Sequence, residues 1–146
     1  MRALFGRAIV HVCFKVSVVR IIFLPHSSMS FLPKTKRFDV IVTNPPYIPA
    51  ADIAGLEPEV RDFDPRKALD GGADGLDFYR RLSREAGDYL APGGWIMLEF
   101  GDGQAEPLKK LFAEQMWIVE ALKADYSGRQ RILTARRQES APRGST

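Results

Sequence analysis

Cysteine and histidine are scarce in this chain of 146 residues: it has one cysteine, Cys13, and two histidines, His11 and His26. One cysteine cannot form an internal disulfide, and with two histidines it does not make a zinc site, so we expect no metal. The low cysteine content is typical of a reducing compartment, and we predict a cytoplasmic protein. The apolar stretch at residues 8–14 is too short to cross a bilayer, so we expect no membrane partner.

Acidic residues are absent before Asp39, and Gly6 is the one glycine before Gly55. An α/β domain that binds a nucleotide-like cofactor needs a glycine-rich turn after an early strand and an acidic residue after the next strand. Residues 1–36 have neither feature and form an atypical basic segment, in which we predict one strand at residues 18–24. We therefore expect an α/β domain that is truncated, without its first strands and its glycine-rich cofactor turn.

The net charge of +3 is unevenly distributed. Residues 1–36 hold six of the 21 basic residues and no acidic residue, so the rest of the chain holds 15 basic and 18 acidic residues. An acidic balance in this larger part argues against a phosphate-binding surface and against nucleic acid as a partner. Its length and its 45% of hydrophobic residues suit one globular domain.

The most informative motif is Asn44-Pro45-Pro46-Tyr47, which directly follows the apolar residues 38–43. These preceding residues are largely β-branched and do not alternate with polar ones, which predicts a strand covered on both faces in an α/β sheet. Ligands of such sheets bind beyond the carboxyl ends of the strands. The motif therefore lies where chemistry is expected.

The motif offers hydrogen-bond acceptors in a rigid frame. Proline has no N–H, so the carbonyls of Asn44 and Pro45 remain available to a ligand, and the Asn44 side chain adds an acceptor and a donor. Two such acceptors match both N–H bonds of a primary amide or an exocyclic amino group, and the Tyr47 ring can pack on that planar group. Holding both hydrogens directs the nitrogen lone pair at an electrophile, so no titrating base is needed. The structural alternative is a simple turn or an extended proline ligand.

Three stretches of the chain resemble the release factor glutamine methyltransferases. They read RFDVIVTNPPYIP at residues 37–49, LEPEVRDFDPRKALDGGADGLDFYRRL at residues 56–82 and LAPGGWIMLEFGDGQ at residues 90–104. NPPY also occurs in enzymes that methylate the amino group of adenine or cytosine, whereas the long second stretch favours the protein-glutamine branch. Over residues 37–137, the resemblance implies a Rossmann-like class I methyltransferase sheet with helices on both faces.

The resemblance implies transfer of a methyl group from S-adenosylmethionine to the glutamine side-chain amide in the Gly-Gly-Gln loop of peptide-chain release factors. Asn44 is also implied to contact the cofactor. In the loop of residues 48–73, Glu59 and Arg61 are expected on the substrate side, or alternatively to form a surface ion pair with each other. The residues implied to be catalytic and to bind substrate are Asn44, Pro45, Pro46 and Tyr47.

Two alternatives remain open. One is amino methylation of adenine or cytosine in nucleic acid, and the other is an inactive methyltransferase fragment. We expect the truncated chain to be impaired and to bind S-adenosylmethionine only weakly by itself. The edge of the strand at residues 38–43 would then be exposed or would pair with residues 18–24.

Beyond the motif, Asp74 predicts the N-cap of a helix that runs to about residue 90. Trp95 and Trp117 are predicted to be core residues, and residues 138–146 a disordered tail. The inner face of the helix that follows Asp74 is predicted to hold Phe78, Leu82, Ala86 and Tyr89. Later strands are predicted at residues 95–100, 116–122 and 131–135, the last one antiparallel, with a short helix after residue 103.

Overall fold

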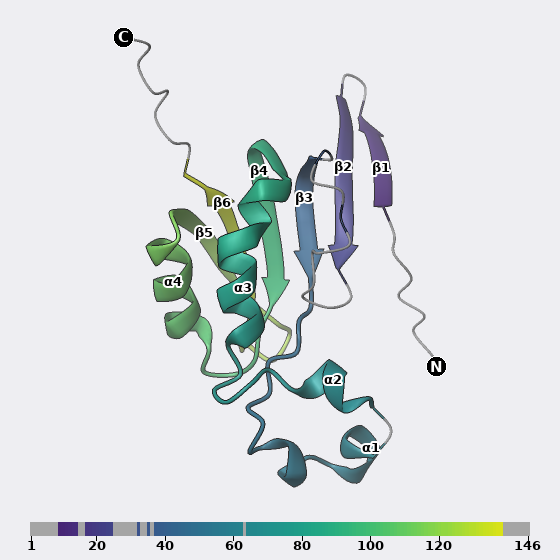
Figure 1. Cartoon of the computed structure of the whole chain (residues 1–146), viewed down its shortest axis with the longest axis vertical. Coiled ribbons are helices and arrows are strands. Elements are labelled where there is room, and N and C mark those ends of the chain that lie inside the picture. Colours follow the sequence, from purple (N-terminus) through teal and green to yellow (C-terminus); the bar gives the residue numbers. More distant parts are fainter. Residues whose placement is uncertain are drawn as a thin grey trace.

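The computed structural model describes residues 9–14, 17–24, 32, 35, 37–62 and 64–138. These ranges contain a sheet of six strands in the order β1-β2-β3-β4-β6-β5 (Figure 1). The strands are β1 (Ile9–Phe14), β2 (Ser17–Leu24), β3 (Phe38–Thr43), β4 (Leu90–Glu99), β5 (Trp117–Ala124) and β6 (Gln130–Arg137). The α-helices are α1 (Pro58–Arg61), α2 (Arg66–Leu69), α3 (Asp77–Glu85) and α4 (Ala105–Glu114), and 3₁₀ helices occupy Ile53–Gly55 and Ala86–Tyr89.

The centre of the sheet is parallel. Ile22 of β2 pairs with Ile41 of β3, which pairs with Ile96 of β4. The chain crosses from β3 to β4 through α3, and α4 links β4 to β5. β6 then returns antiparallel between β4 and β5, as predicted. These features confirm the predicted α/β class.

The amino-terminal side of the sheet was only partly predicted. β2 is the strand expected at residues 18–24, and it pairs directly with β3, one of the two outcomes expected for that edge. β1 pairs antiparallel with β2 and was not predicted. Most of the predicted tail lies outside the described residues, of which Gln138 is the last.

The two longer helices lie on one face of the sheet (Figure 1). Trp117 of β5 contacts both of them: its Nε1 donates a hydrogen bond of 2.7 Å to the Ser83 carbonyl of α3, and its ring lies 5.6 Å from that of Phe112 of α4. Their apolar faces cover Ile41 and Ile96, which are fully buried. The resemblance implied helices on both faces of the sheet, but within the described residues no helix covers the opposite face.

That opposite face carries partly exposed apolar side chains. Trp95 and Ile132 are each 37% exposed, although Trp95 was predicted to be a core residue. The prediction for Trp95 was wrong because neighbouring residues of a strand point to opposite faces of the sheet. Ile96 points toward the helices, so Trp95 points away from them. Trp117 is only 4% exposed, which confirms the prediction for the second tryptophan.

Helix α3 begins later than predicted. Asp74 accepts a hydrogen bond of 3.1 Å from the backbone N–H of Leu76, but the helix begins at Asp77 and passes into the 3₁₀ helix at residue 86. Tyr79 is the buried aromatic residue of its first turns, whereas Phe78 is only partly buried. The Tyr79 hydroxyl donates a hydrogen bond of 2.8 Å to the Glu99 carbonyl, which anchors α3 to the end of β4. The other residues predicted on the inner face, Leu82, Ala86 and Tyr89, are buried.

No helix within the described ranges has the length and apolar character needed to span a lipid bilayer.

Candidate functional site

Asn44 directly follows the last residue of β3, Thr43. Because β2, β3 and β4 are parallel, their carboxyl ends meet at one edge of the sheet, and the motif lies there (Figure 1). Asn44 is exposed, whereas Pro45 and Pro46 are buried and Tyr47 is half-buried. The motif thus presents one polar side chain to solvent from a rigid, buried support.

The Asn44 side chain is uncommitted. No hydrogen bond joins it to any residue in the part of the chain that the structure describes. The two prolines after it fix their own φ angles and donate no hydrogen bond, so they restrict where the Asn44 amide can point. The arrangement leaves one donor and one acceptor available to a ligand at the carboxyl edge.

Tyr47 packs against the end of the neighbouring strand. A Cβ placed on Gly101, just beyond β4, would lie 2.8 Å from Cδ2 of the Tyr47 ring, so the ring rests on the glycine backbone. Burial and the Glu99 carboxylate raise the pKa of the Tyr47 phenol above its usual value, and Arg131 acts in the opposite direction. The phenol is therefore neutral at physiological pH, which suits a packing surface better than a base.

Backbone hydrogen bonds join the two ends of the loop that follows the motif. The backbone N–H of Ile48 donates to the Leu69 carbonyl at 3.1 Å, and the N–H of Gly71 donates to the Ile48 carbonyl at 2.8 Å. The N–H of Ala50 donates to the Gly72 carbonyl at 2.9 Å. The enclosed residues include α1 and α2, which extend beyond the carboxyl edge of the sheet (Figure 1). The loop predicted at residues 48–73 therefore begins immediately after Tyr47, and backbone hydrogen bonds hold its two ends together.

Glu59 and Arg61 both lie on α1 and are exposed. Arg61 pairs with its neighbour Asp62, with Nε 2.7 Å from Oδ1, and not with Glu59 as the alternative interpretation held. This contact raises the pKa of Arg61 and lowers that of Asp62. Within the described ranges, no hydrogen bond or ion pair joins Glu59 or Arg61 to the motif.

Sequence reasoning missed Gln104, which follows the turn after β4. Its Nε2 donates to the Tyr47 carbonyl at 3.0 Å and to the Gly75 carbonyl at 3.3 Å, and its Oε1 accepts from the Gly101 N–H at 2.9 Å. The available signal was its position as the last residue of the third resembling stretch. Composition could not reveal the contact, because 57 positions separate Gln104 from Tyr47.

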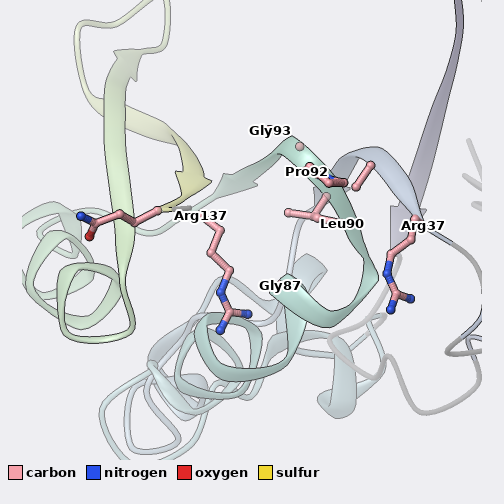
Figure 2. A pocket seen from close by; sticks show the side chains of 9 residues that line it. Arg37, Gly87, Leu90, Pro92, Gly93 and Arg137 are labelled. Carbon is pink, nitrogen blue, oxygen red and sulfur yellow. The ribbon is translucent and has the colours of Figure 1, made fainter. Parts of the chain in front are cut away.

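A hollow of about 290 Å³ lies near the amino end of β3, the end opposite to the motif (Figure 2). Arg37 and Arg137 contribute side chains to it, together with residues 90–94. Arg37 directly precedes β3 and Asn44 directly follows it, so the hollow opens at the amino end of that strand. It is therefore separate from the candidate site.

A mixed α/β sheet with Asn-Pro-Pro-Tyr at the carboxyl end of a parallel strand is the arrangement that the resemblance to methyltransferases implies. Comparison of sequences identifies the type. The chain matches the carboxyl-terminal portion of the release factor glutamine methyltransferases, which confirms the resemblance seen in its motifs.

Three relatives illustrate the match. The release factor glutamine methyltransferase of Geobacter sulfurreducens is 60% identical over 78 residues, which are 53% of this chain and 28% of the relative. That of Rhodospirillum rubrum is 53% identical over 105 residues, or 72% of this chain and 32% of the relative. That of Bradyrhizobium diazoefficiens is 48% identical over 101 residues, or 68% and 34%. The chain thus spans about a third of the length of these curated relatives.

No family model matches the chain. Among solved structures, a ribosomal protein L11 methylase from Lactobacillus delbrueckii subsp. bulgaricus aligns with a TM-score of 0.48 and 16% identity, over 77% of this chain and 42% of that chain. A methyltransferase from Pyrococcus furiosus aligns with a TM-score of 0.46 and 24% identity, over 68% and 41%.

Proposed function

We propose that the chain carries the part that binds the methyl acceptor in an enzyme that methylates the glutamine amide in the Gly-Gly-Gln loop of peptide-chain release factors, using S-adenosylmethionine in the cytoplasm. The supporting observation is the exposed Asn44 on buried prolines at the carboxyl edge of the sheet. Similarity to relatives named release factor glutamine methyltransferases favours a glutamine over a nucleic-acid base.

The chemistry requires an electrophilic methyl group, which S-adenosylmethionine supplies on its sulfonium sulfur. The amide nitrogen forms a bond to the methyl carbon, the carbon–sulfur bond breaks with its electron pair returning to sulfur, and the nitrogen releases one proton to solvent. An amide nitrogen is a poor nucleophile because its lone pair is delocalised into the carbonyl. The protein's task is therefore to orient that nitrogen and to accept hydrogen bonds from its two N–H groups.

The proposal gives each motif residue a role. The Asn44 side-chain oxygen and the Pro45 carbonyl accept the two N–H bonds of the substrate amide, and Pro46 holds them at a constant separation. The half-buried ring of Tyr47 packs on the substrate amide. Asn44 also fits contact with the methyl donor, since its side chain is exposed and uncommitted at this edge.

The loop that begins after Tyr47 is proposed to meet the release factor. Glu59 and Arg61 are exposed on α1, beyond the edge at which Asn44 lies (Figure 1). Glu59 is free to contact a basic or amide group of the partner, whereas Arg61 must first exchange its pairing with Asp62. Exposed ion pairs of this kind contribute little to stability because solvent screens them, so that exchange costs little.

The test uses this chain and a chimera in which its residues 37–146 replace the matching portion of the Geobacter sulfurreducens relative. The chimera should methylate a folded release factor and should not methylate a variant whose loop glutamine is alanine, because an amide-shaped site leaves its acceptors unpaired without that side chain. Asn44→Ala should lower the rate about 100-fold or more while cofactor affinity changes less.

Gln130→Ala is the control, since this amide side chain is exposed at the start of β6. It should leave the rate unchanged. An Asn44→Ala chimera of near-normal rate would refute the role of Asn44. Methylation of DNA or RNA with none of the release factor would establish amino methylation of bases instead, and a chimera that folds but methylates neither would identify an inactive fragment.

A further inference from the structure

The Gln104 side chain joins three segments that are distant in sequence. It bonds to the Tyr47 carbonyl at the end of the motif, to the Gly75 carbonyl before α3 and to the Gly101 N–H after β4. A backbone N–H can only donate, so the Gln104 oxygen must face Gly101 and its NH₂ group must face the two carbonyls. Donors and acceptors are thus matched on all three sides.

Packing confines Tyr47 from the same directions. A Cβ on Gly75 would lie 2.3 Å from the backbone carbonyl oxygen of Tyr47 and 2.8 Å from Nε2 of Gln104. A Cβ on Gly71 would lie 2.9 Å from the Tyr47 Cα. Such approaches are possible only for glycine. The Tyr47 backbone is therefore enclosed by glycines and held by one side chain.

We propose that Gln104 is a positioning residue for the methyl-transfer site: by holding the Tyr47 carbonyl, it sets the direction in which the chain leaves the two prolines and so the placement of the Asn44 and Pro45 acceptors. This inference rests on the proposed function. Gln104 itself does not touch the reacting atoms. Its effect is on alignment, and a displacement of about 1 Å at a reacting group can cost about 100-fold in rate.

Glutamate at position 104 distinguishes the donor from the acceptor role. A carboxylate of the same length can still accept from Gly101, but it has no hydrogen to donate, and it places negative charge beside the Tyr47 and Gly75 carbonyls. When this carboxyl is protonated, its O–H can again donate to Tyr47. The Gln104→Glu variant should therefore regain function as pH falls, which an amide-to-alanine change cannot do.

The first experiment uses the 146-residue chain alone. Asn44 is its only asparagine, so selective ¹⁵N-asparagine labelling gives one side-chain NH₂ signal in an NMR spectrum. Gln104→Ala and Gln104→Glu should shift or broaden that signal, whereas Gln130→Ala should not. Circular dichroism must show that the variants retain their helices. If Gln104→Ala unfolds, Gln104→Glu compared at pH 7 and pH 4 decides the result, since glutamate has an ordinary pKa of about 4.3. An unchanged Asn44 signal in a folded variant overturns the inference.

The second experiment measures methyl transfer in the chimera. Gln104→Ala and Gln104→Glu should lower kcat about 10-fold or more at pH 7 with KM for the release factor changed less than 3-fold. The ratio of Gln104→Glu to wild-type activity should rise at lower pH. Equal losses in both variants at every pH would assign Gln104 a purely structural role. A wild-type chimera without activity would instead refute the proposed function and leave the Asn44 signal to decide the positioning role.

Discussion

At the scale of single residues, the motif combines one exposed amide side chain with tightly packed neighbouring residues. Asn44 is exposed, while Pro45 and Pro46 are buried and the Tyr47 backbone is pressed against glycines. An amide that must orient a substrate benefits from such a support, because less conformational entropy is lost when the ligand binds. The same packing leaves no room for a side chain at the surrounding glycine positions.

Gly75→Ala measures how tightly Tyr47 is enclosed. Gly75 has φ +76°, and a Cβ added to it would lie 2.3 Å from the backbone carbonyl oxygen of Tyr47. Gly128 has a similar φ of +81° with nothing within 4 Å, so Gly128→Ala carries the backbone strain alone. We expect Gly128→Ala to lower the free energy of unfolding by about 1–2 kcal/mol, and Gly75→Ala by a further 1–3 kcal/mol, roughly, in urea titrations. Equal losses in the two variants would contradict the close packing.

At the scale of elements, α3 connects the loop that follows the motif to the end of β4. It follows directly on the closed loop, and Tyr79 fastens it to the end of β4. Its first turn is organised by Arg80, which bonds to Asp74 and, at 2.8 Å, to Asp77. Asp74 therefore stabilises the start of α3 through its charge as well as through its bond to Leu76.

Asp74→Asn tests this contribution through its pH dependence. The hydrogen bond from Arg80 lowers the pKa of Asp74 below its ordinary value of about 3.9. A carboxyl group with a lowered pKa stabilises the fold above its unfolded pKa, and that contribution is lost as the pH falls through the folded pKa. The variant should melt below wild type at pH 7 and close to it near pH 2, by a small margin because both side chains are largely exposed.

Asp102→Asn is the control for this measurement, because Asp102 is exposed in the turn after β4. It should leave the melting temperature unchanged at both pH values. If the deficit of Asp74→Asn were the same at pH 2 as at pH 7, the contribution of Asp74 would not be one of charge.

For the whole molecule, the main feature is that β2 pairs directly with β3. The residues between these strands, 25–37, contain neither glycine nor an acidic residue. A nucleotide-like cofactor is usually held by a glycine-rich turn and by a carboxylate that binds its ribose. At this edge the described part of the chain presents the exposed Asn44. The matched relatives are about twice as long as this chain.

Isothermal titration of the 146-residue chain with S-adenosylmethionine should therefore show no binding tighter than about millimolar, which corresponds to about 4 kcal/mol. The chimera, which contains the remaining part of the relative, should bind more tightly under the same conditions. Micromolar binding by this chain alone would show that its first 36 residues form a cofactor site of another design.

The sequence by itself determined the parts that depend on local chemistry. An apolar β-branched run predicted the strand at residues 38–43, and the motif after this run led to the proposed site and substrate. The short helix predicted after residue 103 is α4, in which Leu108 and Phe112 are buried. These features follow from periodicity, from rigid prolines and from side-chain hydrogen-bonding capacity, which act over a few neighbouring residues.

Only the tertiary structure decided the parts that depend on pairing across long separations. Register placed Ile96 toward the helices and left Trp95 on the partly exposed face. Gln104 acquired its role because the turns after β3 and β4 meet at the same edge of the sheet. A hydrogen bond between residues 57 positions apart has no local pattern, since it exists only once the strands are aligned.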